Sequence, residues 1–226
     1  MTNGVGLNAI TIAEYAIMLM LTFAKGYRDV VRAQDRREWL LALPGKMELA
    51  GSRALLLGYG AIGKLIEARL KAFDVDVTVV RRSGGADGIL GPNQWRSRLS
   101  EFGWVVLAVR ATPGTERMIG TDELGSMKDT AVLVNNARGT VIDQSALVAA
   151  LQDKVIGKAL LDVTDPEPLP ADHILWSLDN AHVTMRLLGR AQDKMFAHSA
   201  QRFLKNLDRF GRGETVEPMF DPALGY

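Results

Sequence analysis

The sequence contains no cysteine among its 226 residues. This absence excludes disulfide bonds, thiolate metal sites and a cysteine nucleophile, and it favours a reducing compartment. We predict no metal site.

The sequence also lacks a long apolar run and an excess of charge of either sign. Its most apolar segment, Ala16 to Ala24, is much shorter than the about 20 apolar residues that a transmembrane helix needs. Residues 1–6 show no secretory signal pattern. The formal net charge is +1, with basic and acidic residues interspersed, whereas nucleic-acid and anionic-membrane partners usually select a clustered basic face. We therefore expect a cytoplasmic protein without a nucleic-acid or membrane partner.

From Ser52 onward, short apolar runs alternate with amphipathic stretches. The runs predict six strands, at Ala54–Leu57, Val75–Val80, Trp104–Val109, Ala131–Val134, Lys158–Leu161 and His182–Thr184. The stretches between them predict helices at Ile62–Phe73, Trp95–Glu101, Asp122–Met127 and Gln144–Gln152. Strands that alternate with helices in this way predict a parallel sheet with helices on both faces.

Further helices are predicted at the two ends of the chain. Asn8 can cap a first helix that runs to about Lys25, and its apolar residues lie nearly all round. A helix of this kind is buried on more than one side, which predicts a subunit interface and a homodimer. Gly26 ends this first helix, and a more polar helix follows. At the other end of the chain, Arg190–Arg209 predicts a long amphipathic helix.

The motif Gly58-Tyr59-Gly60-Ala61-Ile62-Gly63 fits G-x-G-x-x-G directly after a predicted strand and at the start of a helix. Gly58 permits the tight turn, Gly60 lets a pyrophosphate approach the backbone, and Gly63 allows close packing of helix on strand. The helix N-terminus offers N–H groups to the phosphates. This context predicts a Rossmann-type, doubly wound α/β fold that binds a dinucleotide; the alternative is a turn without a ligand.

The second predicted strand ends in Val80-Arg81-Arg82-Ser83. A site selective for NAD places Asp or Glu here, on the ribose 2′-hydroxyl. Two guanidinium groups and a hydroxyl instead suit a 2′-phosphate, so Arg81, Arg82 and Ser83 predict NADP, with NAD as the other candidate. Alternatively, both arginines are solvated loop charges.

Several ordered motifs resemble those of the D-isomer-specific 2-hydroxyacid dehydrogenases, the group of phosphoglycerate, glyoxylate and hydroxypyruvate reductases. The resemblance runs from about Asn3 to about Arg212. Its motifs are Ala13-Glu14-Tyr15, the glycine loop, Ala111-Thr112-Pro113-Gly114-Thr115-Glu116, Asn135-Asn136-Ala137-Arg138-Gly139, Leu161-Asp162-Val163 and Glu167-Pro168-Leu169-Pro170.

The resemblance implies roles for individual residues. Arg138 would hold the carboxylate and carbonyl oxygen of a small 2-oxo acid, Asp162 would touch the nicotinamide carboxamide, and Glu167 would pair with a catalytic histidine and raise its pKa. Val109, Thr115 and Ala137 would line the cofactor. The alternatives are a surface salt bridge for Arg138, a strand-end cap for Asp162 and a loop carboxylate without a role for Glu167.

The sequence departs from the family pattern at the catalytic histidine, whose position is occupied by Arg186. Arginine stays protonated and cannot donate the proton, although it can still hold an anion. The three histidines, at positions 173, 182 and 198, do not align with the site. Arg110 and Asn136 add polar bulk near the expected nicotinamide position.

The resemblance implies that the sequence starts within the family's linking helix, and we expect no counterpart of the family's substrate domain, of about a hundred residues. We expect a single NAD(P)-binding domain over residues 1–226, with linking helices at both ends. The first functional hypothesis is a reductase that transfers hydride between NADP(H) and a small 2-oxo acid. The second is a cofactor-binding module with impaired catalysis, such as a sensor, scaffold or fragment, because of Arg186.

Overall fold

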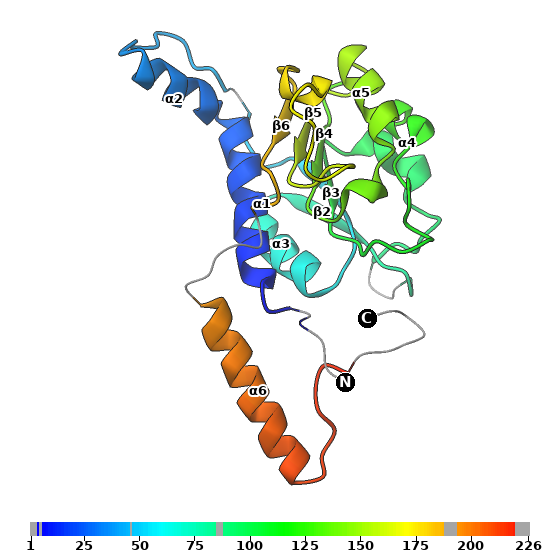
Figure 1. The fold of residues 1–226 in the computed structure, drawn as a ribbon. Helices are drawn as coiled ribbons and strands as arrows, with labels where there is room; N and C mark the ends of the chain where they lie inside the picture. The colour runs from blue at the N-terminus through cyan, green and yellow to red at the C-terminus, as the bar shows by residue number, and fades with distance from the viewer. Residues whose placement is uncertain (1–3, 5, 46, 85–87, 188–193, 220–226) are drawn as a thin grey trace.

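The computed structural model describes residues 4, 6–45, 47–84, 88–187 and 194–219, and it is built on one parallel sheet (Figure 1). The sheet has six strands in the order β2-β1-β3-β4-β5-β6. Their bounds are β1 Arg53–Leu57, β2 Asp76–Val80, β3 Trp104–Leu107, β4 Val132–Asn135, β5 Lys158–Leu161 and β6 Ala181–Val183. The doubly wound parallel sheet of about six strands with helices on both faces is thus confirmed.

Successive residues of the central strands are buried on opposite faces of the sheet. In β1, Leu55 and Leu57 belong to one core cluster, and Ala54 and Leu56 belong to the other. Because both faces carry a core, the strands read as continuous apolar runs rather than as alternating ones.

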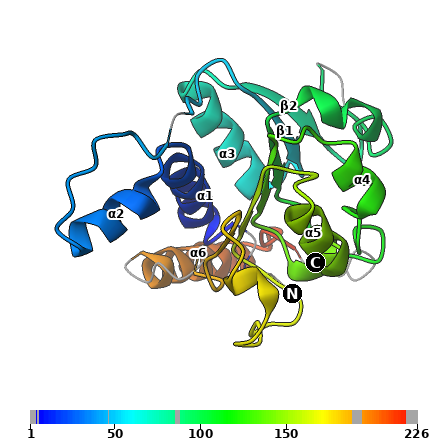
Figure 2. The ribbon, with the colours of Figure 1, turned by 90° about the horizontal axis from the view of Figure 1, so that it is seen from above.

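Helices cover both of these faces (Figure 2). The face of Ala54 and Leu56 packs against α1 (Ala9–Ala24) and α3 (Ala61–Ala72). The opposite face packs against α4 (Thr121–Gly125), α5 (Gln144–Gln152) and the 3-10 helix η1 (Arg96–Glu101). Short 3-10 helices η2 (Gly139–Val141) and η3 (Ile174–Trp176) lie in the connections. The segment at 95–101 is therefore a 3-10 helix instead of an α-helix, as short helical pieces often are.

The first helix, α1, begins where the sequence predicts, but its predicted cap is wrong. Asn8 occupies the N-cap position with φ −103° and ψ 10°, and its side chain makes no capping hydrogen bond. The helix is buried on one side only, since Ile10 and Met18 stay 48% and 44% exposed. Gly26, in the left-handed conformation at φ +61°, separates α1 from α2 (Tyr27–Asp35).

Within the described part of the chain, no single helix has both the length and the hydropathy of a membrane span. Only α1 and α2 taken together reach them, and these two helices meet at a bend of 70°.

The last helix, α6 (Met195–Gly211), ends two residues later than predicted, and the predicted start at 190–193 lies outside the described residues. It extends away from the sheet (Figure 1). Its large apolar side chains are exposed: Phe196, Phe203, Leu204, Leu207 and Phe210.

Candidate cofactor and substrate site

The order of the strands reverses at β1, which pairs with β2 on one side and with β3 on the other. In open α/β sheets, ligands bind in the crevice at the carboxyl ends of the two strands that flank such a switch point. Gly58 follows β1 and Ala108 follows β3, so the glycine loop lies at this crevice.

The three glycines of the loop differ in their surroundings. Gly58 has φ +106°, and an added Cβ would lie 2.5 Å from the carbonyl oxygen of Ala108. A Cβ on Gly63 would lie 2.1 Å from the carbonyl oxygen of Gly58, whereas one on Gly60 would meet nothing within 4 Å. Two glycines therefore allow close backbone packing, while the third leaves its backbone open to an approaching group.

The start of α3 has the properties of a phosphate site. Gly60 is its N-cap and provides no side-chain cap, so the first N–H groups, of Ala61 and Ile62, have no partner in the part of the chain that the structure describes. Unpaired N–H groups and the helix dipole favour an anion at this position. These residues fit the pyrophosphate of a dinucleotide.

Beside the loop, the end of β2 brings the predicted 2′-phosphate residues close to it, since the Gly58 N–H donates to the carbonyl oxygen of Val80 at 3.0 Å. Arg81, Arg82 and Ser83 are all exposed. The Arg81 Nε donates to the carbonyl oxygen of Gly84 at 3.0 Å, which fixes part of its side chain. The segment thus offers guanidinium groups at the crevice rim.

Tyr59 is held against α3 rather than across the crevice. Its hydroxyl donates to Glu67 Oε2 at 2.6 Å, and this hydrogen bond raises the pKa of Tyr59. The Lys64 ammonium lies 5.7 Å from the centre of the ring. The side chain therefore braces the glycine loop.

The loop after β4, which carries Arg138, is fixed by a neighbouring asparagine. Asn135 Oδ1 accepts from the Ala137 N–H at 3.0 Å, and Asn135 Nδ2 donates to the Arg138 carbonyl oxygen at 3.0 Å. The exposed Arg138 guanidinium donates through Nη1 to the carbonyl oxygen of Ala137 at 2.7 Å. Sequence reasoning missed this bracing role of Asn135; the signal for it is a polar residue at the end of a buried strand.

The loop after β4 also touches the loop after β5. A Cβ on Gly139 would lie 1.9 Å from the carbonyl oxygen of Thr164, so the two backbones are in direct contact. Because Thr164 lies between Asp162 and Glu167, this contact brings the loop of Arg138 next to the loop that carries both carboxylates.

Asp162 is buried and links the ends of β5 and β6. Its Oδ1 accepts from the Thr184 hydroxyl at 2.8 Å and from the Leu187 N–H at 2.9 Å. Its carbonyl oxygen accepts from the Arg186 N–H at 2.6 Å. These bonds support the strand-end role that the sequence left open for Asp162.

Glu167 and Arg186 form an ion pair, with Glu167 Oε2 2.5 Å from Arg186 Nη1. The other oxygen, Oε1, accepts from the Thr164 N–H at 3.3 Å. Arg186 has a φ of +57°, a strained conformation for a residue with a side chain. The carboxylate expected to pair with a histidine thus binds the arginine that occupies that position.

The remaining predicted residues lie around the same edge. The Thr115 hydroxyl donates to the carbonyl oxygen of Arg110 at 2.6 Å and accepts from the Thr112 N–H at 2.9 Å, so it stabilises the turn after β3. Val109 is half-buried and packs against the core, and Ala137 is buried.

Asn136 is only 8% exposed, and neither polar atom of its side chain has a partner among the described residues. The structure therefore gives this polar residue a buried position.

Two of the three histidines have structural contacts of their own. His173 Nδ1 accepts from the Leu175 N–H at 3.2 Å and caps η3. His182 packs edge-on against Phe23, and burial lowers the pKa of His182 to about 4.

The chain matches the sequence model described as "D-isomer specific 2-hydroxyacid dehydrogenase, NAD binding domain" over residues 17–185. It is 33% identical to a glyoxylate reductase of Korarchaeum cryptofilum over 94% of the chain and 66% of that relative. It is 35% identical to a glyoxylate reductase of Pyrococcus furiosus over 89% of the chain and 63% of that relative.

Among solved structures, the chain resembles a D-isomer-specific 2-hydroxyacid dehydrogenase of Xanthobacter autotrophicus Py2 in complex with NADPH and MES. The TM-score is 0.82 at 29% identity, over 97% of this chain and 70% of that one. The chain therefore belongs to the D-isomer-specific 2-hydroxyacid dehydrogenase family and contains the family's NAD-binding domain.

Proposed function

We propose that the chain is the cofactor-binding part of a reductase that transfers hydride from NADPH to a small 2-oxo acid. The observation that carries the proposal is the meeting of three loops at the carboxyl edge of the sheet, the same edge that carries the glycine loop. These loops carry Arg138, Glu167 and Arg186. They are joined by the contact of Gly139 with Thr164 and by the ion pair between Glu167 and Arg186.

Each residue has a role in this proposal. The Arg138 guanidinium binds the planar carboxylate of the substrate through two hydrogen bonds, for which its geometry is suited. Asp162 orients the segment that ends in Arg186, and Thr115 holds the turn at the cofactor rim. When bound, NADPH supplies the hydride.

NADP is proposed as the preferred cofactor on the basis of Arg81, Arg82 and Ser83. The solved relative from Xanthobacter autotrophicus binds NADPH. Arg82 supplies the second guanidinium group at the rim, so Arg82→Gln is expected to weaken NADPH binding about tenfold and to leave NADH binding unchanged. Equal weakening of both cofactors would contradict this assignment.

The experiment that tests the reductase is NADPH oxidation measured against a panel of small 2-oxo acids, comparing the wild type with Arg138→Gln. We expect any turnover to be lost in Arg138→Gln because the substrate carboxylate loses its partner. Arg117→Gln is the matched control, since Arg117 is an exposed arginine on the neighbouring turn that pairs only loosely, at 4.0 Å, with Asp143.

The second candidate function is a binding module with impaired catalysis, and the Glu167–Arg186 ion pair favours it. The arginine of this pair occupies the position of the family's proton-donating histidine, and a guanidinium cannot take that role. Arg186→His distinguishes the two functions. A gain of reductase activity supports an enzyme that lost its proton donor, and no gain supports the binding module.

We further propose that residues 1–226 act as one NAD(P)-binding unit, with α1 and α6 as its linking helices. We propose a homodimer through the exposed side of α1, because the apolar side chains of Ile10 and Met18 are exposed there, on either side of the charged Glu14. Sedimentation at micromolar concentration tests this: we expect a dimer, and Met18→Glu should shift it to a monomer. A monomeric wild type would refute the proposed dimer.

A further inference from the structure

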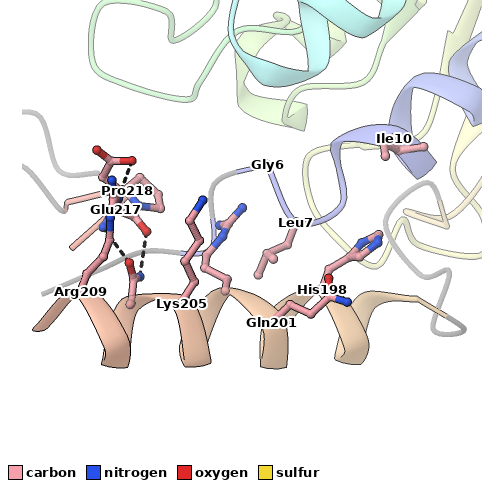
Figure 3. A pocket seen from close by; sticks show the side chains of 11 residues that line it. Gly6, Leu7, Ile10, His198, Gln201, Lys205, Arg209, Glu217 and Pro218 are labelled. Carbon is pink, nitrogen blue, oxygen red and sulfur yellow. Dashed lines mark hydrogen bonds and ion pairs between the residues drawn. The ribbon is translucent and has the colours of Figure 1, made fainter. Parts of the chain in front are cut away.

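Two asparagine side chains of this chain satisfy both of their polar atoms, and a third, Asn136, satisfies neither. Asn206 Nδ2 donates to the carbonyl oxygen of Glu217 at 2.8 Å and its Oδ1 accepts from the Glu217 N–H at 3.0 Å, in the pocket between α6 and the start of α1 (Figure 3). Asn135 forms two such bonds with the loop of Arg138. Asn136 Nδ2 and Oδ1 are both buried and have no partner in the described part of the chain. A buried amide of this kind indicates a position where a bound group supplies the missing partners.

The side chain of Asn136 lies on the face of the sheet that α1 and α3 cover. Asn136 continues β4 by one residue, since its N–H donates to the carbonyl oxygen of Leu107 at 3.1 Å. Side chains along a strand alternate between the two faces of a sheet. Val132 and Val134 belong to the core cluster of the α3 face, so Asn136 lies on that face as well. This is the face on which α3 offers its N-terminus to a pyrophosphate.

Asn136 lies between the glycine loop and Asp162. The register of the sheet places the last residues of β3, β4 and β5 beside one another. The residues that follow them, Ala108, Asn136 and Asp162, are therefore neighbours across the carboxyl edge. Ala108 in turn lies against Gly58, whose added Cβ would be 2.5 Å from the Ala108 carbonyl oxygen. A dinucleotide that runs from the glycine loop to Asp162, where the family resemblance places the nicotinamide carboxamide, passes Asn136.

Because both polar atoms of Asn136 are buried, a ligand reaches them only if a neighbouring segment moves. The segment after β6 lies against the adjacent Asp162, to which Arg186 and Leu187 donate their backbone N–H groups. Met185 and Arg186 both have a φ of +57°, a strained conformation for residues with a side chain. Strain of this kind is often found at ligand clamps, so this segment is suited to give way when a ligand enters.

We propose that Asn136 binds the carboxamide of the nicotinamide, with Nδ2 donating to the carboxamide oxygen and Oδ1 accepting from the carboxamide NH₂ group. The inference rests on the proposed NADP(H) binding and assigns one residue to the nicotinamide end of that site. A primary carboxamide offers an acceptor and a donor side by side, which are the two partners that Asn136 lacks. The carboxylate of a 2-oxo acid offers acceptors only and would leave Oδ1 without a donor.

The test compares the wild type with Asn136→Leu by thermal unfolding without ligand and by titration calorimetry with three probes. These are NADP⁺, its acetylpyridine analogue, in which a methyl group replaces the carboxamide NH₂, and 2′-phospho-ADP-ribose, which has no nicotinamide. The matched control is Asn180→Leu, at the opposite edge of the sheet, where Asn180 Nδ2 donates to the carbonyl oxygen of Leu151 at 2.9 Å.

We expect Asn136→Leu to bind NADP⁺ about tenfold more weakly than the wild type and to bind 2′-phospho-ADP-ribose equally well. The wild type should prefer NADP⁺ to the acetylpyridine analogue, and this preference should shrink in Asn136→Leu. Without ligand, Asn136→Leu should melt at a higher temperature than the wild type, because the exchange removes two unpaired buried polar atoms at similar volume. Asn180→Leu should melt at a lower temperature and bind all three probes like the wild type.

Wild-type affinity of Asn136→Leu for NADP⁺ would overturn the inference while leaving the proposed cofactor intact. An equal loss of affinity for 2′-phospho-ADP-ribose would also overturn it, because the effect would then not reside at the nicotinamide. Failure of the wild type to bind either NADP⁺ or 2′-phospho-ADP-ribose would instead refute the proposed function itself. If Asn136→Leu does not fold, the smaller Asn136→Val decides the question by the same titrations.

Discussion

Replacing Gly60 and Gly63 by alanine, one at a time, should separate cofactor binding from folding. Gly60 has φ −84° and ψ −162°, an extended conformation open to alanine, and nothing lies within 4 Å of the added Cβ. Such a substitution typically stabilises a protein by about 0.4 to 1 kcal/mol, because it restricts the unfolded chain. The new methyl group, however, would lie where the pyrophosphate approaches the backbone. We therefore expect Gly60→Ala to fold as well as the wild type and to bind NADPH at least about tenfold more weakly.

Gly63→Ala should behave in the opposite way. Its Cβ would lie 2.1 Å from the carbonyl oxygen of Gly58, so the backbone of α3 has to move by about 1 Å to reach an ordinary contact distance. Overpacking of this kind costs about 1 to 3 kcal/mol. For a chain of this size, that lowers the melting temperature by about 2 to 12 °C.

The assay combines thermal unfolding without ligand and NADPH titration for both variants. The reasoning is refuted if Gly60→Ala binds NADPH like the wild type, because the cofactor then does not approach this backbone. Wild-type stability of Gly63→Ala would contradict the close packing of the glycine loop on α3.

Two further predictions concern stability. Gly139→Ala should lower the free energy of unfolding by about 1 to 3 kcal/mol, because its Cβ would lie 1.9 Å from the carbonyl oxygen of Thr164. Gly125→Ala is the control, since nothing lies within 4 Å of its added Cβ. Equal denaturation midpoints of the two variants would contradict the contact between the loops. His182 should make the fold less stable as the pH falls from about 6.5 to about 4, because burial lowers its pKa and only the unfolded chain takes up the proton in that window. The loss is at most about 3 kcal/mol, and chemical denaturation across this range should show a smaller pH dependence for His182→Gln than for the wild type.

The fold could be predicted from the sequence because both faces of the sheet are covered. Each strand then reads as an uninterrupted apolar run, as in Leu55–Leu57 and Val105–Leu107, between glycine-containing or polar segments. The cap at Asn8 was predicted wrongly because a residue type at the right position does not ensure the backbone geometry that a capping bond needs.

The candidate site could be predicted only as separate motifs. The sequence placed Glu167 and Arg186 in one site through the family pattern, and the structure joins them in an ion pair. No pattern in the sequence indicated that Gly139 packs on Thr164, because contacts between loops of different strands leave no periodic signal. The orientation of α6 was equally hidden, since amphipathicity alone would turn its apolar face, not Arg202, toward the protein.

We propose that the crevice beside Gly58 binds NADP(H) in preference to NAD(H). A paired titration of NADPH and NADH into the purified wild-type protein, followed by nicotinamide fluorescence or by heat, tests this proposal. We predict saturable binding of NADPH at least about tenfold tighter than that of NADH, because Arg81 and Arg82 gain charge-assisted hydrogen bonds to the 2′-phosphate. Tighter binding of NADH would contradict the cofactor assignment, and binding of neither would contradict the claim that this domain binds a dinucleotide.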